Sequence, residues 1–338
     1  MAEIFISPNF KNPRAPHTLL QLKEAIRLCE QGGIAASGGT FPRTRWAINV
    51  VSDWGPDGSR LGAQAVNYAW RGNVHAIDLT HDIKPFDIRH AAFVLESNLR
   101  LAVPNTIFLC VVDPEVGSER TPIVVQGGNK TFFIGPHNGV FDLVLRGINT
   151  IYGLVKAVEI SRNTQHVIRE GAIHAVDGDA IFAPAAGAIV RHYGIPDGLG
   201  AEIPLSQFGE VRNWEEARLE NGKAHGSIEW VDHYGTFVTN IPPGLLELDD
   251  RPGTLLAIRG EKSNFSITAP YATHFAAVEA GKPLVLLQGN GFLHIAINHG
   301  RAVEHLGFEK FGEGIELEVL QAKVEETAKI GWATGAWR

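Results

Sequence analysis

Two hydrophobic patterns follow one another along this chain, and their order constrains the fold more than any other feature. From Trp46 to about residue 205, apolar runs suited to strands alternate with stretches of helical spacing. The strand-like runs are AINVVSD, VHAIDL, TIFLCVVD, TPIVVQG and TFFIG, and the helical stretches are LGAQAVNYAWRG, DIRHAAFVLESNLRLA and AIFAPAAGAIVRHYG. From about residue 225 to residue 322, the period shortens to two and glycine turns separate the runs GSIEWVDHYG, TFVTNI, GTLLAIRG, PLVLLQGNG, GFLHIAIN and IELEV. The first pattern predicts a largely parallel sheet flanked by helices, and the second predicts a small all-β domain that resembles a barrel. We therefore expect an α/β fold with two domains, 46–205 and 225–322.

Three further segments complete the chain. Residues 1–45 contain one stretch of helical spacing, HTLLQLKEAIRLCEQGG, followed by a linker, and we expect this helix to pack on the main body. Residues 206–224 have mixed charge and predict a surface linker between the domains. Residues 323–338 form a tail without a usable period.

The composition argues against several classes of protein. The formal net charge of the 338 residues is −7, so we expect neither nucleic acid nor an anionic membrane as a partner. No stretch approaches the roughly 20 apolar residues of a membrane-spanning helix, and the first residues lack the pattern of a secretory signal. Cys110 lies in the apolar run IFLCVV, which predicts a buried thiol. We expect a cytoplasmic protein.

Acidic residues follow three predicted strands. Asp53 ends the run AINVVSD, the turn THDIKPFD follows the next run, and Asp113 ends TIFLCVVD. The carboxyl ends of parallel strands form the edge of the sheet where ligands bind. An aspartate there can accept two hydrogen bonds from a ribose diol, which suggests a nucleoside ligand. The alternative is that these residues only cap turns.

The segment VVDPEVGSER contains a possible charge pair. Pro114 and Gly117 predict a tight turn that brings Arg120 back towards Asp113. Such a pair at a crevice can orient a water molecule and lower the pKa of the carboxylate. The alternative is a surface salt bridge that contributes little to stability.

The remaining motifs are weaker. The turn GPHNG exposes His137 and Asn138, and AVDGDAIFAP places Asp177 and Asp179 at a helix start, where aspartates commonly act as caps. No histidine or cysteine spacing indicates a metal site, and neither a dinucleotide nor a P-loop motif is present. We therefore expect no metal and no cofactor.

Six segments in matching order resemble the S-adenosyl-L-methionine (SAM) hydroxide adenosyltransferase family, which is related to the SAM-dependent fluorinase and chlorinase. They extend from about Ile48 to Val319 and read SDWG, DLTHDIKPFDIRHAAFVL, VVDPEVGSER, GPHNG, IFAPAAG and DHYGTFVTNI. The resemblance implies that water displaces methionine from C5′ of SAM, giving adenosine and L-methionine. It also implies a homotrimer whose active sites lie between subunits.

The resemblance further implies roles for particular residues. Asp113 and Arg120 match two members of the family's Asp-Arg-His set, which positions and activates water. Asp53 would hold the ribose hydroxyls, and Phe86 would lie against the substrate. Four residues of the β domain would complete the binding site: Asp232 at the methionine ammonium group, Gly289 and Asn290 at its carboxylate, and Asn298 near adenine.

The chain departs from the family in AVDGDAIFAP. The family usually has histidine where Asp177 stands, arginine at Asp179 and aspartate at Ala180, while His174 lies three residues before Asp177. Two more departures occur elsewhere: Thr236 replaces a usual asparagine, and Arg60 replaces a frequent tyrosine.

These departures allow two interpretations of Asp177. It could be a second acid/base group, paired with Asp113 across Arg120, because two nearby carboxylates raise the pKa of one of them. Alternatively, the site is degenerate and Asp177 only caps its helix.

Hydrolysis of SAM is the leading hypothesis for function. A carboxylate beside the nucleophile would repel a halide, and the halogenase relatives lack an acid there, so halogenation ranks lower. The replaced histidine leaves open a non-catalytic protein that binds SAM or adenosine. An enzyme for another 5′-substituted adenosine is the fourth hypothesis.

Overall fold

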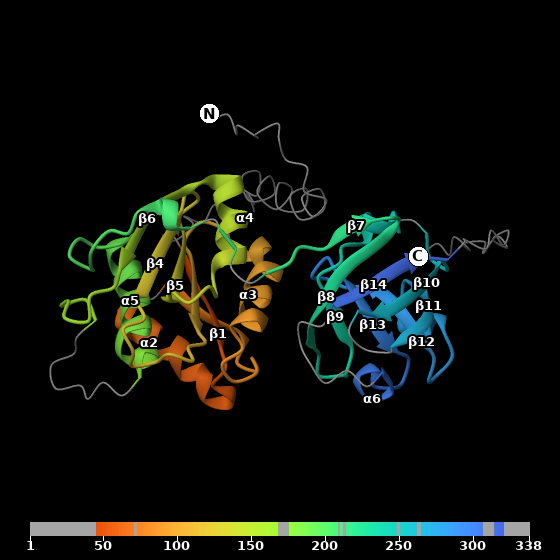
Figure 1. Cartoon of the computed structure of the whole chain (residues 1–338). Coiled ribbons are helices and arrows are strands. Elements are labelled where there is room, and N and C mark those ends of the chain that lie inside the picture. Colours follow the sequence, from red (N-terminus) through yellow and green to blue (C-terminus); the bar gives the residue numbers. More distant parts are fainter. Residues whose placement is uncertain are drawn as a thin grey trace, which may run out of the picture. The chain divides into compact units, whose positions relative to one another are not determined.

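The computed structural model describes residues 45–70, 73–167, 176–208, 210–211, 214–248, 251–261, 265–306 and 314–320. The predicted N-terminal helix and the C-terminal tail lie outside these residues. The chain divides into two compact units, 1–214 and 215–338 (Figure 1). Within the described part of the chain, no helix is long and apolar enough to cross a membrane.

A six-stranded sheet with the order β2-β1-β3-β5-β4-β6 forms the centre of the first unit. Its strands are β1 (Trp46–Ser52), β2 (Val74–Thr80), β3 (Thr106–Val111), β4 (Pro122–Gly127), β5 (Thr131–Pro136) and β6 (Leu154–Glu159). Strands β2, β1, β3 and β5 are parallel, whereas β4 is antiparallel to both β5 and β6. The prediction of a largely parallel sheet is confirmed.

Helices cover both faces of this sheet (Figure 1). On one face α2 (Ser59–Ala69) packs against α5 (Ala183–His192), and on the other α3 (Ile88–Ser97) packs against α4 (Asp142–Tyr152). One π-helical turn, Gly178–Phe182, leads directly into α5. Helix α4 and strand β6 were not predicted.

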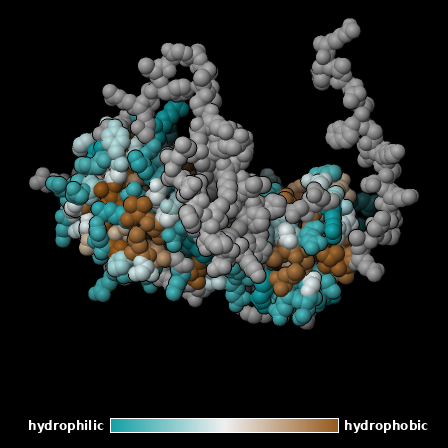
Figure 2. Space-filling model, turned by 90° about the horizontal axis from the view of Figure 1, so that it is seen from above, coloured by the Kyte–Doolittle hydropathy of each residue, from teal (hydrophilic) through white to brown (hydrophobic). Residues whose placement is uncertain are grey.

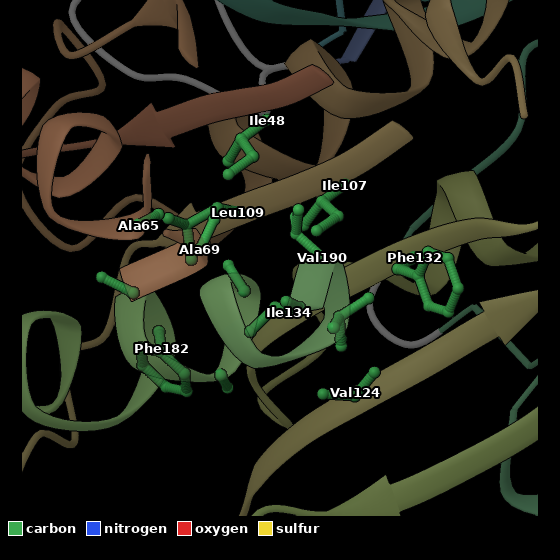
Figure 3. Close-up of a cluster of buried hydrophobic side chains, with 14 of the residues drawn as sticks. Ile48, Ala65, Ala69, Ile107, Leu109, Val124, Phe132, Ile134, Phe182 and Val190 are labelled. Atoms are coloured by element: carbon green, nitrogen blue, oxygen red, sulfur yellow. The ribbon is translucent and has the colours of Figure 1, made fainter. Parts of the chain in front are cut away.

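The core beneath α2 and α5 takes alternate residues of the strands, because successive strand side chains point to opposite faces. Ile48 of β1, Ile107 and Leu109 of β3 and Ile134 of β5 meet Phe182 in this cluster (Figure 3). Each side chain of this kind contributes roughly 1.5–3 kcal/mol when fully buried. The packing fixes the segment before α5 against the sheet.

The opposite face of β3 carries Cys110, which is completely buried. Burial raises the pKa of this thiol, so the prediction of a buried, unreactive cysteine is confirmed at Cys110. Cys29 lies outside the described residues.

The second unit is a β-barrel. Seven strands follow the order β14-β10-β11-β12-β13-β9-β8, and pairing of β14 with β8 closes the barrel, while β7 adds to β8. The strands are β7 (Arg218–Glu220), β8 (Lys223–Val231), β9 (Phe237–Thr239), β10 (Leu255–Gly260), β11 (Ser266–Ala272), β12 (Pro283–Leu287), β13 (Leu293–Ile297) and β14 (Gly314–Val319). A short helix, α6 (Ala302–Leu306), precedes β14.

The prediction of a small barrel-like domain is confirmed. Strand β7 lies inside the segment 206–224, which had been predicted to be a linker. All three residues of β7 are exposed, so the strand has no buried face, and three residues are too few for a pattern of period two to be recognised. Strand β11 and helix α6 were also not predicted.

The contact between α2 and α5 depends on Gly187. A Cβ atom at this position would lie 2.4 Å from Cβ of Tyr68 and 2.7 Å from its carbonyl carbon. Only glycine allows the two helices to approach this closely.

We predict that Gly187→Ala lowers the free energy of unfolding by about 1–3 kcal/mol, because the added methyl overpacks the helix contact. Gly194→Ala is the matched control, since no atom lies within 4 Å of its added Cβ. Chemical denaturation of both variants measures the difference. Equal stability of the two variants would show that the close approach is not a constraint.

Candidate active site

Two aspartates follow neighbouring parallel strands at the same edge of the first unit's sheet. Ser52 of β1 is level with Val111 of β3, so Asp53 and Asp113 emerge side by side. Both line a cavity of about 210 Å³, together with Phe86, Asp177 and apolar residues that include Phe182. This volume is below the roughly 300–1,000 Å³ of a typical ligand pocket. This cavity is therefore smaller than one that encloses a whole ligand.

Arg120 holds Asp113 with two hydrogen bonds. Its Nε donates to Oδ1 of Asp113 over 3.2 Å, and its Nη2 donates to Oδ2. The backbone N–H of Glu115 donates to the same Oδ1 over 3.2 Å, inside the turn that contains Gly117 with φ 85°. The side chains of Arg120 and Asp113 are only 3% and 5% exposed. The predicted turn is confirmed, and the alternative of a surface salt bridge is wrong.

Asp177 lies on the other side of the same arginine. Nη2 of Arg120 also donates to Oδ2 of Asp177 over 2.8 Å. Arg162, from the turn after β6, donates two hydrogen bonds to Asp177, from Nη1 to Oδ1 over 2.6 Å and from Nη2 to Oδ2 over 2.9 Å. Asp177 stands at the N-cap position of the π-helical turn, but its side chain makes no capping hydrogen bond there. The interpretation that Asp177 only caps its helix is therefore wrong.

The protonation of Asp177 follows from these partners. Desolvation by burial raises its pKa, but the hydrogen bond to Arg162 and the charges of Arg162 and Arg120 outweigh that effect. The pKa therefore lies below its ordinary value, and the raised pKa expected for an acid/base group at Asp177 is wrong. Sequence reasoning missed Arg162, because it stands 15 residues from Asp177 in an irregular segment.

Two other departures from the family pattern are paired in space. Arg60 of α2 lies 3.2 Å from Asp179, and its guanidinium lies 4.8 Å above the ring of Trp54. Trp54 in turn covers Gly178, where a Cβ atom would lie 2.7 Å from the ring. His174 lies outside the described residues.

Asp53 supports an unusual conformation at Phe86. Phe86 has φ 68°, in the left-handed region that residues with a Cβ rarely adopt, and its side chain is exposed. Oδ2 of Asp53 accepts a hydrogen bond of 2.8 Å from the Phe86 N–H. The next residue, Asp87, caps α3 by accepting from the N–H of His90 over 2.9 Å. The bond to Asp53 thus holds the Phe86 ring at the cavity.

The turn GPHNG supports the strand ends. Nδ2 of Asn138 donates to the carbonyl of Val112 over 3.0 Å, and its Oδ1 accepts from the N–H of Val140. The ring of His137 lies 5.3 Å from that of Phe208. Asn138 therefore fixes the backbone next to Asp113.

In the second unit, three of the sequence-predicted residues make local hydrogen bonds. Oδ1 of Asp232 accepts from the N–H groups of Tyr234 and Thr236 over 2.9 and 2.8 Å. Asn298 donates its side-chain amide to the carbonyl of Val278 and its N–H to the carbonyl of Lys282. The Asn298 N–H is therefore already occupied.

Asn290 is also engaged locally. Its Oδ1 accepts from the N–H of Phe292 over 3.2 Å and lies 3.1 Å from Nε2 of His294. Burial lowers the pKa of His294 to about 4, so its ring is neutral near pH 7. A neutral ring can donate from Nε2 to Asn290 and fix the turn that contains Gly289.

The strand register separates the β-domain residues into two groups. Phe237 pairs with Ile295, so the turn of Asp232 lies at the end of β13 where Asn298 follows. Gly289 and Asn290 precede β13, whose five residues span about 17 Å. The ammonium and carboxylate groups of methionine share one carbon atom. The structure therefore does not bring Asp232 and the 289–290 turn together around one such group within this unit.

No group of three or more histidine, cysteine, aspartate or glutamate residues suited to a metal ion occurs in the part of the chain that the structure describes. The charged centre of the first unit consists instead of paired carboxylates and guanidinium groups.

Comparisons with known proteins agree with this arrangement. Residues 48–197 match the family model of the SAM hydroxide adenosyltransferase N-terminal domain, and residues 226–313 match that of the C-terminal domain. A protein of Thermus thermophilus named (R)-S-adenosyl-L-methionine hydrolase is 28% identical over 81% of this chain and 99% of its own length. A protein of the same name from Salinispora tropica is 29% identical over 78% of this chain and 94% of its own length.

A solved structure is also similar over most of the chain. The crystal structure of an uncharacterized conserved protein from Thermotoga maritima has a TM-score of 0.68 and 31% identity, and the match covers 80% of this chain and 99% of that chain. The family matches extend over most of both units. The chain therefore belongs to the SAM hydroxide adenosyltransferase family.

Proposed function

We propose that this protein uses water to cleave SAM at C5′, which yields adenosine and L-methionine. The buried pair of Asp113 and Arg120, beside Asp53 in the cavity, is the observation that carries the proposal. The positive sulfur of SAM makes methionine a good leaving group. Catalysis therefore requires mainly a water molecule placed in line with the C5′–S bond and the exclusion of other water.

Asp113 is suited to placing that water. Arg120 and the Glu115 N–H occupy both lone pairs of Oδ1, and Arg120 occupies one lone pair of Oδ2. The remaining lone pair of Oδ2 can accept a hydrogen bond from water. As the water oxygen bonds to C5′, the C5′–S electron pair moves to sulfur, and a proton of the water passes to Asp113. Arg120 donates to both carboxylate oxygens and so fixes the orientation of Asp113 towards the water.

The same charges argue against a halogenase. Asp113 and Asp177 both line the cavity, and an anionic nucleophile between them would be repelled. The ion pairs of Asp177 and Asp179 also argue against a degenerate site, because each of these two carboxylates has a guanidinium partner.

We assign the parts of the ligand as follows. Asp53 would bind the ribose hydroxyls through Oδ1, and Phe86 would lie against the adenosine portion. In the β domain, Gly289 and Asn290 would bind the methionine carboxylate, and Asn298 would lie near adenine. Asp232 accepts hydrogen bonds within its own turn, and the register places this turn at the opposite end of β13 from Gly289 and Asn290. Both observations argue against Asp232 as the partner of the ammonium group.

We further propose a cytoplasmic homotrimer with active sites between subunits. The first unit's cavity is too small for all of SAM, and Phe86 and Val116 present exposed apolar side chains at its rim. Figure 2 shows apolar residues gathered in separate regions of a largely hydrophilic face, as at protein interfaces. The buried free thiol of Cys110 fits a reducing compartment.

Light scattering coupled to size exclusion should give three times the mass of one chain, 36.7 kDa. A monomeric mass at the concentration of the activity assay would contradict the trimer.

Incubation of the purified protein with SAM should release adenosine and methionine in equal amounts, with and without chloride, as measured by liquid chromatography. A 5′-chloro nucleoside would instead indicate a halogenase. Tight binding of SAM without turnover would leave a binding protein and overturn the hydrolase.

Asp113→Asn should lower kcat by at least about 10²-fold, the contribution of a general base, while KM changes little. Glu115→Gln is the control, because Glu115 contacts Asp113 only through its backbone N–H and its side chain is exposed. Steady-state kinetics measure both variants. Turnover by Asp113→Asn at the rate of the control would remove Asp113 from the mechanism.

A further inference from the structure

Four charged side chains form a continuous chain of hydrogen bonds in the first unit. In order, they are Asp113, Arg120, Asp177 and Arg162. The two inner groups are shared: Arg120 donates Nη2 to both carboxylates, and Oδ2 of Asp177 accepts from both arginines. We name these four residues the ion-pair network.

We propose that Arg162 is a positioning residue of the hydrolytic site, which holds Asp177 and thereby keeps Arg120 on Asp113. The proposal rests on the proposed function for its kinetic consequences. Neither the sequence patterns nor the family resemblance had assigned Arg162 a role.

Because Asp113 and Asp177 both accept a hydrogen bond from Nη2 of Arg120, the two carboxylates compete for this guanidinium group. Asp177 is nearly buried, with 9% of its side chain exposed, and needs positive charge close to it. Arg162 provides two hydrogen bonds, so Asp177 takes only one from Arg120. Without Arg162, Arg120 would be the one guanidinium left to Asp177 in the described structure and would be drawn away from Asp113.

The charges of the ion-pair network add up to zero, with two carboxylates and two guanidinium groups. Among the described residues, Arg120 and Arg162 face Asp177 directly, and Asp113 lies beyond Arg120. Loss of Arg162 would leave one excess negative charge. Because Arg162 lowers the pKa of Asp177, its loss favours protonation of Asp177, and a neutral Asp177 no longer holds Arg120 through an ion pair.

Arg120 depends on these carboxylates for its orientation. Its third nitrogen, Nη1, is buried and has no hydrogen-bond partner among the described residues. The ring of Phe182 lies 5.5 Å from its guanidinium carbon and offers no hydrogen bond in the plane of the guanidinium group. Asp177 is therefore the second anchor of Arg120.

Arg162 does not line the cavity of Asp53 and Asp113. It lines a separate cavity of about 320 Å³, together with Arg120, Ser118 and Ser161. Arg162 is thus bonded to the site through Asp177 and Arg120, and beyond these contacts it acts on Asp113 by its charge. Its loss should lower kcat and leave KM nearly unchanged.

The test compares Arg162→Ala, Arg162→Lys and the double variant Arg162→Ala with Asp177→Asn, using the full-length protein and SAM. Arg162→Ala should lower kcat near pH 7 about tenfold, with KM changed less than about threefold, and should move the acid limb of the kcat profile to higher pH by about one unit. Arg162→Lys should recover most of the loss, because the charge is restored. The double variant should return the acid limb to the wild-type position, because it removes both charges together.

Arg259→Ala is the matched control. Arg259 also forms ion pairs with two acidic side chains, Glu316 and Glu318, but lies in the second unit. An unchanged kcat in Arg162→Ala would overturn the proposal. A loss that is equal at every pH, and is recovered by neither lysine nor the double variant, would also overturn it.

A second measurement does not need turnover. The folded-state pKa of Asp177 is lowered, so its ion pairs stabilise the fold above the ordinary carboxyl pKa, and this contribution is lost as the pH falls through the lowered value. The difference in Tm between wild type and Arg162→Ala should therefore be several degrees at pH 7 and should shrink below about pH 4.

The two proposals can fail separately. If the wild-type protein does not cleave SAM, the proposed hydrolase function is wrong, but the Tm values still test the ion-pair network. With Asp177→Asn measured as the second single variant, the double variant should then be more stable than the sum of the Arg162→Ala and Asp177→Asn changes predicts. Strictly additive Tm changes would show that Arg162 and Asp177 are not coupled and would overturn the inference.

Discussion

The charged centre of this protein depends on the neutralisation of two buried carboxylates by one shared arginine. Asp113 and Asp177 come from segments 64 residues apart, and Arg120 bonds to both. A carboxylate at this depth is stable in its ionised form only with charge and hydrogen bonds close to it. The parallel register of β1 and β3, the tight turn after β3 and the packing of α5 on the sheet all serve to bring these groups into contact.

The residues that depart from the family pattern also depend on charge. Asp177 and Asp179 flank a glycine that packs beneath Trp54, and neither carboxylate is left without a guanidinium group. Arg60 comes from α2 and Arg162 from the turn after β6. Substitutions that look unrelated along the chain are therefore complementary in space.

Local sequence signals predicted much of this arrangement. The apolar runs predicted β1 to β5, and Pro114 with Gly117 predicted the turn that returns Arg120 to Asp113, because these features act over a few residues. Helix α4 was also readable in principle: its buried residues Leu143, Val144, Leu145 and Ile148 have helical spacing. The contribution of Arg162 was not readable, because it depends on the tertiary path of the chain. The lowered pKa of Asp177 was not predicted for the same reason, since the sequence showed the neighbouring carboxylate and not the second arginine.

The hydrogen bond from Phe86 to Asp53 has a thermodynamic consequence. The left-handed backbone at Phe86 is unfavourable on its own, and the bond to Oδ2 of Asp53 offsets part of that cost. A donor group that displaced the Phe86 N–H from Oδ2 would return the strain to the loop. A ligand bound at Asp53 would therefore be coupled to the orientation of the aromatic ring. The cavity would favour ligands that leave this bond intact over those that compete for it.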